Sequence, residues 1–134
     1  MSRILVDTSI WIDYFEDKDS YTIIDKLVID NLICTNDLIL AELVPFFHLQ
    51  EKDELVEALM ALQKYEIRID WPQLIHMQIS NLKHGINGVG VPDLIILENV
   101  LANDLILFTK DKHFMLMKDV FDFKMFDYKE VKRR

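Results

Sequence analysis

The sequence is poor in cysteine, glycine and proline. Its 134 residues include one cysteine, three glycines and three prolines, whereas 51% are hydrophobic. The single cysteine, Cys34, allows no intrachain disulfide and no multi-cysteine zinc site, which fits a reducing cytoplasm. The low glycine and proline content excludes collagen-like repeats, and the high hydrophobic content excludes a disordered chain.

Positive charge is also scarce. The chain has 15 lysines and arginines against 23 aspartates and glutamates, which gives a formal net charge of -8. This balance excludes a protein that binds nucleic acid by neutralising phosphates over a basic face. It leaves open an enzyme that meets phosphate through a bound divalent metal, because carboxylates are what hold Mg²⁺ or Mn²⁺.

Long apolar runs are missing as well. Asp7 interrupts the first apolar run too early for a signal peptide, and the richest later stretch, residues 38–49, contains Glu42 and Pro45. A membrane-spanning helix needs about 20 apolar residues. We therefore expect a soluble, cytoplasmic protein with no membrane segment, and the length suits a single domain over residues 1–134.

Short apolar runs alternate with helical patterns along the chain. Strands are predicted at residues 4–6, 31–35, 66–69, 105–108 and, at an edge, 124–128. Helices are predicted from about residue 8, from residue 20, and over 37–48, 51–65, 70–84, 93–102 and 111–117. Strands separated by helices form parallel β-α-β units, so the expected fold class is α/β, a three-layer α/β/α sandwich with a central parallel sheet.

The predicted helix over 37–48 has two unusual features. It is apolar nearly all round, which predicts burial, and Pro45 is expected to kink or end it. It also carries Glu42 on an apolar stripe, with Leu38 and Phe46 one turn away on either side. An unpaired buried carboxylate is costly, so Glu42 needs a partner, which could be a lysine, a hydrogen-bond donor or a metal.

Three further acids follow predicted strands or open a predicted helix. Asp7 directly follows the first strand, and Asp111 comes shortly after the strand over 105–108. Asp93 opens a helix after the glycine-containing loop 85–90, which lacks the Gly-Lys-Ser/Thr ending of a phosphate-binding P-loop. In an open parallel sheet, ligands bind beyond the carboxyl ends of the strands. The three acids therefore share a location suited to a ligand.

Each acid alone has a structural explanation. Asp7 could cap a helix, and Asp93 could be a first-turn residue favoured by the helix dipole. Asp111 could form a turn, and Glu42 could be a satisfied structural residue. The shared location favours a joint role, because several carboxylates close together repel one another unless a cation lies among them.

Four segments carry a resemblance to a known family. Residues 6–15 (VDTSIWIDYF) closely resemble the opening of PIN-domain nucleases, particularly the VapC toxins of toxin-antitoxin pairs. Residues 40–43 (LAEL), 91–97 (VPDLIIL) and 109–114 (TKDKHF) resemble the family's second, third and fourth motifs in order and spacing. The resemblance covers about residues 4–127 and implies a metal-dependent endonuclease that hydrolyses phosphodiester bonds of single-stranded RNA.

The resemblance also implies roles for the four acids. Asp7 and Asp93 would be the main direct ligands of Mg²⁺ or Mn²⁺. Glu42 and Asp111 would bind the metal directly or through water. Together they would form the catalytic acidic quartet of the enzyme.

Two hydroxyl residues lie next to these acids in the sequence. Ser9 and Thr109 would orient a carboxylate or a metal-bound water by hydrogen bonding. Alternatively, each could cap a helix or end a strand.

Histidine and lysine residues complete the neighbourhood. His113 stands where many relatives have another acid, which is expected to weaken a second metal site, and a surface or packing role is favoured over general-base chemistry for His84 and His113. Lys110 and Lys112 flank Asp111 and are the better placed of the lysines to meet RNA. The basic residues near the C-terminus are expected to be solvated, and they are Lys129, Lys132, Arg133 and Arg134.

The resemblance further implies a homodimer and an antitoxin partner. Trp11, Tyr14, Phe15, Phe46 and Phe47 exceed what two short helices need for a small core, so some of them are expected to be exposed. A groove lined by such residues would take an apolar helix of an antitoxin. An antitoxin arginine reaching the acids would block the site through charge-assisted hydrogen bonds.

Other functions remain open at this point. A PIN-domain nuclease that processes RNA outside a toxin-antitoxin pair is one alternative. A phosphoacceptor signalling module also gathers acids around Mg²⁺, but it typically has adjacent acids after its first strand, whereas this chain has Asp7, Thr8 and Ser9. A haloacid-dehalogenase-type phosphatase would need a second aspartate where Ser9 stands.

Overall fold

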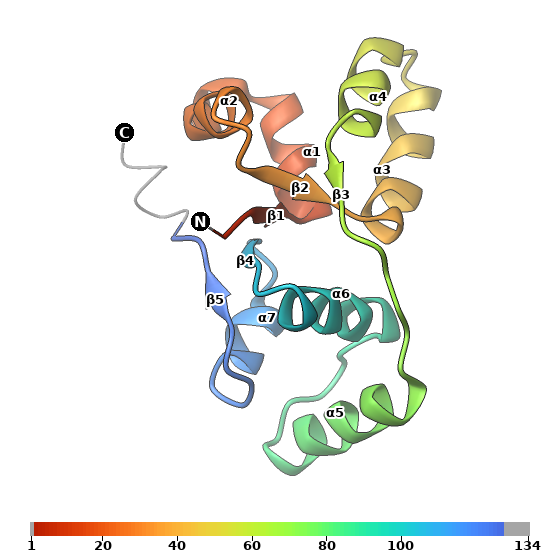
Figure 1. Cartoon of the computed structure of the whole chain (residues 1–134), viewed down its shortest axis with the longest axis vertical. Helices are drawn as coiled ribbons and strands as arrows, with labels where there is room; N and C mark the ends of the chain where they lie inside the picture. The colour runs from red at the N-terminus through yellow and green to blue at the C-terminus, as the bar shows by residue number, and fades with distance from the viewer. Residues whose placement is uncertain (1, 128–134) are drawn as a thin grey trace.

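A five-stranded, fully parallel sheet forms the centre of the computed structural model, which describes residues 2–127 (Figure 1). The strand order is β3-β2-β1-β4-β5. The strands are β1 (Ile4–Val6), β2 (Ile33–Thr35), β3 (Gln63–Lys64), β4 (Ile106–Phe108) and β5 (Lys124–Met125). The predicted central parallel sheet is confirmed.

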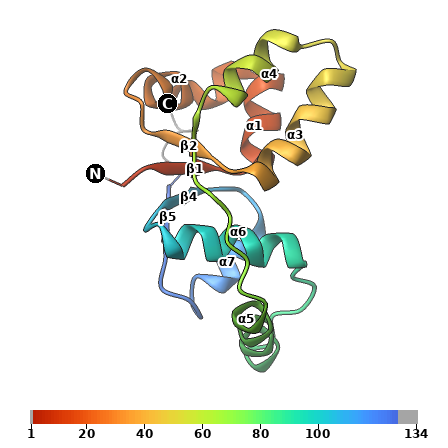
Figure 2. The same cartoon turned by 45° about the vertical axis from the view of Figure 1, so that its right-hand side comes forward.

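Helices cover both faces of the sheet. The first four, α1 to α4, lie on one side and α5 to α7 on the other (Figure 2). Their bounds are α1 (Thr8–Glu16), α2 (Thr22–Ile29), α3 (Asp37–Leu49), α4 (Asp53–Met60), α5 (Trp71–Lys83), α6 (Val91–Ala102) and α7 (Lys112–Met117), with a short 3-10 helix η1 (Lys18–Tyr21) before α2. This is the predicted three-layer α/β/α sandwich. Among the described residues, no helix is both long enough and apolar enough to cross a membrane.

Strand β1 occupies the middle of the sheet. Its residues Ile4, Leu5 and Val6 are all buried, and it pairs with β2 on one side and β4 on the other. A strand covered on both faces needs apolar side chains at every position, which explains the continuous run in place of an alternating one. Because β1 is central, Asp7 lies at the middle of the carboxyl edge of the sheet.

The edge strand β3 corrects one prediction. The helix predicted over 51–65 ends at Met60, and the strand lies at Gln63–Lys64, not at 66–69. The position is decided by β2, whose Cys34 and Thr35 pair with Gln63 and Lys64. Residues 66–69 instead form an extended connection to α5, held where the side-chain amide of Asn99 donates to the carbonyl of Glu66 over 3.2 Å.

Helix α3 confirms the helix predicted over 37–48 and corrects one further prediction. Of the two effects predicted for Pro45, it does not end the helix, which continues to Leu49. A proline removes only one backbone donor, and the fully buried Phe47 anchors the segment after Pro45. The helix is buried on one face only. The buried residues are Ile39, Leu40, Leu43 and Phe47, and the exposed ones include Ala41, Glu42, Pro45, Phe46 and Leu49.

The predicted last strand is shorter than expected. Strand β5 ends at Met125, and Tyr128 of the predicted range lies outside the described residues. The basic residues expected to be solvated also lie outside them, and these are Lys129, Lys132, Arg133 and Arg134.

Candidate functional site

The centre of the site lies where β1 and β4 end side by side. Val6 pairs with Phe108, and the amide of Asp7 donates to the carbonyl of Phe108 over 2.9 Å. Asp7 follows β1, and Thr109 and Asp111 follow β4. The parallel pairing therefore brings residues about a hundred positions apart in the chain to one point at the carboxyl edge.

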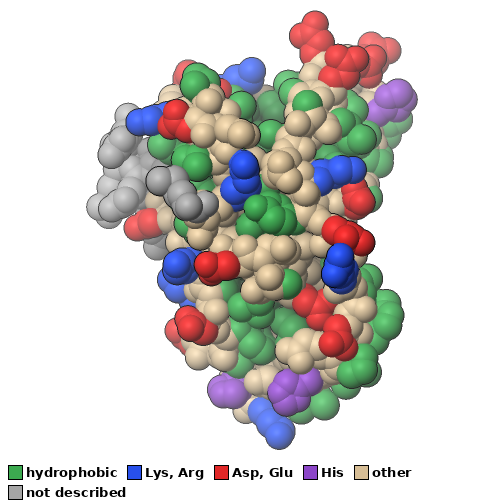
Figure 3. All heavy atoms as spheres, viewed as in Figure 1, with side chains coloured by type: hydrophobic (Ala, Val, Ile, Leu, Met, Phe, Trp, Pro, Cys, Tyr) green, Lys and Arg blue, Asp and Glu red, His purple; other side chains and the backbone are tan. Residues whose placement is uncertain are grey.

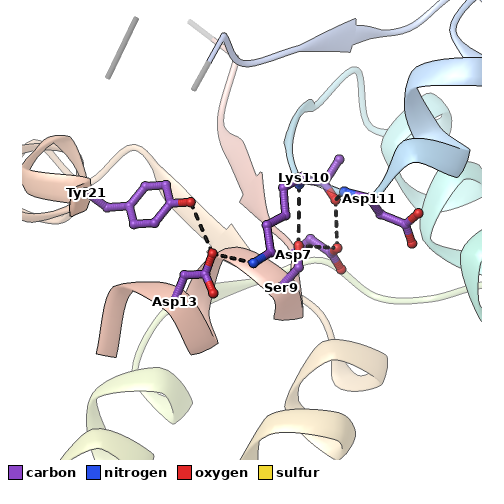
Figure 4. A network of polar contacts seen from close by, with 7 residues as sticks. Asp7, Ser9, Asp13, Tyr21, Lys110 and Asp111 are labelled. Atoms are coloured by element: carbon purple, nitrogen blue, oxygen red, sulfur yellow. Dashed lines mark hydrogen bonds and ion pairs between the residues drawn. The ribbon is translucent and has the colours of Figure 1, made fainter. Parts of the chain in front are cut away.

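Two hydroxyl groups hold the carboxylate of Asp7, which is only 7% exposed. Its Oδ2 accepts from Thr109 Oγ1 at 2.8 Å and from Ser9 Oγ at 3.1 Å (Figure 4). Each hydroxyl oxygen also accepts a hydrogen bond from a backbone amide. Thr109 accepts from the amide of Asp111 at 3.1 Å, and Ser9 accepts from the amide of Lys110 at 3.4 Å. Both hydroxyls thus orient a carboxylate and tie it to the loop after β4.

Lys110 points along this loop toward α1. Its Nζ forms an ion pair with Asp13, whose Oδ2 also accepts from the hydroxyl of Tyr21 at 3.3 Å (Figure 4). The side chain of Lys110 is 41% exposed, so the pair lies at the protein surface. This contact clamps the loop that carries Asp111 onto the last two turns of α1.

Asp93 and Glu42 approach the same point from two other helices. Asp93 lies in the first turn of α6, half-buried, after the N-cap Gly90. Glu42 lies on α3 and accepts from Thr8 Oγ1 at 3.2 Å. Glu42 is an exposed residue and not, as predicted, one embedded in an apolar stripe, because α3 turns this face outward. Of the partners proposed for it, the structure provides a hydrogen-bond donor.

The four acids interact electrostatically. Burial raises the pKa of Asp7, the charge of Asp111 raises it further, and hydrogen bonds from Thr109, the Thr8 amide and Ser9 oppose the shift. Loss of water around the carboxyl raises the pKa of Glu42 although the residue as a whole is exposed, and the charges of Asp7 and Asp93 add to it.

Asp93 links this arrangement to Asp111. Burial raises its pKa, the charges of Asp111 and then Asp7 raise it further, and the Gly90 amide and His113 oppose the shift. Asp7, Glu42 and Asp93 therefore each feel the charge of at least one other acid of the predicted quartet. Such crowding favours a cation among the carboxylates.

A histidine joins the acids. Asp93, Asp111 and His113 each offer one ligand atom, and these atoms all lie within 4.8 Å of one another. Asp111 also caps α7, since its Oδ1 accepts from the amide of His113 at 2.9 Å. Asp111 therefore both caps α7 and belongs to the group of possible metal ligands. His113 is not among the metal ligands predicted from the sequence, although its spacing of two residues from Asp111 at a helix start was an available signal.

The donor set suits a divalent metal. Carboxylate oxygens are the ligands that Mg²⁺ and Mn²⁺ take in proteins, and Asp93 and Asp111 offer such oxygens within 4.8 Å of each other. The charges of Asp7, which follows β1, and of Glu42, on α3, act on the same neighbourhood. The residues present therefore fit such an ion.

Solved structures share this fold. The chain superposes on DNA-bound VapBC from Salmonella typhimurium with a TM-score of 0.74, at 16% identity over 96% of this chain and 99% of that one. It superposes on FitAcB from Neisseria gonorrhoeae with a TM-score of 0.70, at 16% identity over 93% and 97%. For VapBC2 from Rickettsia felis, bound to a DNA fragment from its promoter, the TM-score is 0.69 at 16% identity over 92% and 96%.

Sequence comparison identifies the family. No curated protein sequence matches the chain significantly. The family model described as PIN domain, however, matches residues 4–119. This range includes all four motifs and the four acids at the carboxyl edge of the sheet. The chain belongs to the PIN-domain family.

Proposed function

We propose that this protein is a divalent-metal-dependent endoribonuclease that hydrolyses phosphodiester bonds of single-stranded RNA and serves as the toxin of a toxin-antitoxin pair. The observation that carries the proposal is the convergence of Asp7, Glu42, Asp93 and Asp111, whose charges act on one another. Membership of the PIN family, a family of nucleases, supports phosphodiester hydrolysis. The RNA preference rests on the family resemblance of the motifs.

Each acid has a defined task in this proposal. Asp7 and Asp93 would hold Mg²⁺ or Mn²⁺ directly, and Glu42 and Asp111 would hold it directly or through water. A divalent ion in such a site activates water and stabilises the charge of the leaving oxygen. Thr109 and Ser9 keep the buried carboxylate of Asp7 in one orientation through their hydrogen bonds.

An apolar groove supports an antitoxin partner. The groove between α1, α2 and α4 has a volume of about 310 Å³. Its walls are largely hydrophobic and include Trp11, Tyr14, Phe15, Val28, Ile29, Leu55 and Leu59. A hydrophobic helix fits such a surface, and the structural neighbours include complexes named VapBC. We assign this groove to the antitoxin, with an antitoxin arginine reaching the acids.

The outer face of α5 supports a homodimer. Trp71, Ile75, Ile79 and Leu82 recur at helical spacing and are 57%, 61%, 47% and 58% exposed. Hydrophobic side chains are visible at the surface over this helix (Figure 3). A stripe of this kind buries itself against a copy of itself across a two-fold axis. We assign it to a second copy of the chain.

An RNA-cleavage assay tests the enzyme. Labelled single-stranded RNA is incubated with the protein in Mg²⁺, in Mn²⁺ and in EDTA, beside Asp93→Asn and the control Asp30→Asn. Asp30 is exposed and precedes β2, at the opposite edge of the sheet. Cleavage by wild type and Asp30→Asn, only with metal, is expected. Equal cleavage by Asp93→Asn, or acyl-phosphate formation from acetyl phosphate without RNA cleavage, would contradict the proposal.

A further inference from the structure

His113 lies among the acids and not apart from them. Its side chain is 25% exposed, and its Nδ1 is 3.4 Å from Asp111 Oδ1. A ligand atom of His113 lies within 4.8 Å of ligand atoms of both Asp93 and Asp111. The three side chains come from α6, from the loop after β4 and from the first turn of α7. A single ion could therefore be reached by all three.

The backbone that carries the imidazole is fixed in place. The amide of His113 donates to Asp111 at 2.9 Å, which sets the first turn of α7, and the next residue, Phe114, is fully buried. A Cβ built on Gly88 would lie 3.6 Å from His113 Nε2, so the glycine-containing loop passes beside the ring. A ligand side chain on a fixed backbone loses less conformational freedom when it binds a metal than one on a mobile loop.

We propose that His113 supplies a nitrogen ligand to a divalent metal held by Asp93 and Asp111, and that this ligand makes the site prefer Mn²⁺ to Mg²⁺. The inference rests on the proposed function in requiring that the acids bind a metal. It departs from the expectation from the sequence, in which a histidine in place of an acid weakens a second metal site. Here the histidine alters the preference of the site.

The chemistry of the two ions gives the reason. Mg²⁺ binds through oxygen ligands and keeps a near-octahedral shell of carboxylates and water. Imidazole nitrogen suits transition metals better, and affinity for a mixed nitrogen and oxygen site rises from Mn²⁺ along the first row. A neutral imidazole in place of a carboxylate removes one negative charge. It also replaces an oxygen ligand, which Mg²⁺ prefers, with a nitrogen ligand, which Mn²⁺ accepts.

The competing arrangement is a ring that only orients Asp111. At 3.4 Å the His113 Nδ1 could hydrogen-bond weakly to the Asp111 carboxylate and stay outside the coordination shell. The two arrangements differ in one observable. A coordinated nitrogen couples strongly to the unpaired electrons of Mn²⁺, whereas a remote nitrogen couples weakly.

Pulsed electron paramagnetic resonance on the Mn²⁺-loaded full chain tests this directly. The spectrum of wild type is expected to show coupling from a bound nitrogen, with frequencies that change when histidine is labelled with ¹⁵N. The coupling should vanish in His113→Gln and persist in the control His76→Gln, which alters an exposed residue of α5. The ¹⁵N-histidine experiment uses the wild-type protein alone, so it remains a test even if His113→Gln fails to fold.

Calorimetric titrations test the preference. The ratio of Mg²⁺ to Mn²⁺ dissociation constants should fall at least about tenfold in His113→Asp, which restores an oxygen ligand, and stay unchanged in His76→Gln. Mn²⁺ binding with no bound-nitrogen coupling in wild type, or with an unchanged ratio in His113→Asp, would overturn this inference and leave the nuclease proposal standing. Absence of any Mn²⁺ or Mg²⁺ binding would overturn both.

Discussion

Loss of one buried hydroxyl should weaken the fold in a pH-dependent way. Thr109 is fully buried, donates to the Asp7 carboxylate at 2.8 Å and accepts from the Asp111 amide at 3.1 Å. Thr109→Val keeps nearly the same shape and removes both hydrogen bonds. A hydrogen bond to a charged group contributes about 1.5–3 kcal/mol, and the unsatisfied Asp111 amide, which is only partly buried, costs less than the roughly 1–3 kcal/mol of a fully buried one. We expect the free energy of unfolding at pH 7, without metal, to fall by about 2–4 kcal/mol.

The sign of the pH dependence follows from Asp7. The Thr109 hydrogen bond lowers the pKa of Asp7 against the larger effect of burial, so Thr109→Val raises that pKa further above its ordinary value of 3.8. The charged form therefore becomes costlier in the folded variant, and the difference from wild type is largest at pH values above the folded pKa. It should shrink as pH falls through that pKa, without vanishing, because the Asp111 amide stays unsatisfied.

Urea unfolding followed by circular dichroism measures the effect across pH. Thr109→Ser is the matched control, since it keeps the hydroxyl and loses a methyl group, at a cost of about 1 kcal/mol with little pH dependence. A loss in Thr109→Val no larger than in Thr109→Ser, or constant from acid to neutral pH, would refute the assignment of Thr109 as the residue that holds the charged Asp7.

Four further predictions concern the acids, the metal, the loop and the dimer. Asp7→Asn and Asp93→Asn should each lower RNA turnover at least about a hundredfold with the circular dichroism spectrum retained, and wild-type rates in either would contradict the quartet. Without metal, the raised pKa values mean that folding binds protons, so stability should fall as pH rises above 3.8–4.5, the ordinary carboxyl values. Mn²⁺ at about 100 times its dissociation constant should raise the free energy of unfolding at pH 7 by about 2.7 kcal/mol. A melting temperature that does not change with metal would argue against a preformed site. Lys110→Met breaks the partly exposed pair with α1 and should cost less than about 1 kcal/mol in urea unfolding, so a larger loss would mean that the pair is more than a surface contact. Ile75→Lys should convert the proposed dimer to a monomer in light scattering at micromolar concentration, whereas a monomeric wild type would remove the role assigned to the exposed stripe of α5.

The strands at the centre of the sheet and the acids beside them are local properties of the sequence. Ile4, Leu5 and Val6 form an unbroken apolar run because β1 is covered on both faces, so the run identifies both the strand and its central place. Asp7 and Asp111 stand at the ends of such runs, and a parallel sheet brings strand ends to one edge whatever their separation in the chain. The central strand and the location of these acids could therefore be predicted without knowing which elements contact one another.

Other features depended on the partner that each segment finds. The alternating run at 66–69 looked like a strand, but β3 formed at Gln63–Lys64, where the free edge of β2 offered its hydrogen bonds. The apolar pattern of α3 could not tell which face would meet the core, and the packing left Glu42 on the exposed side. Only the tertiary structure brought His113, in the first turn of α7, to Asp93, in the first turn of α6. A hydrophobic pattern records how much of a segment is buried and not what lies against it.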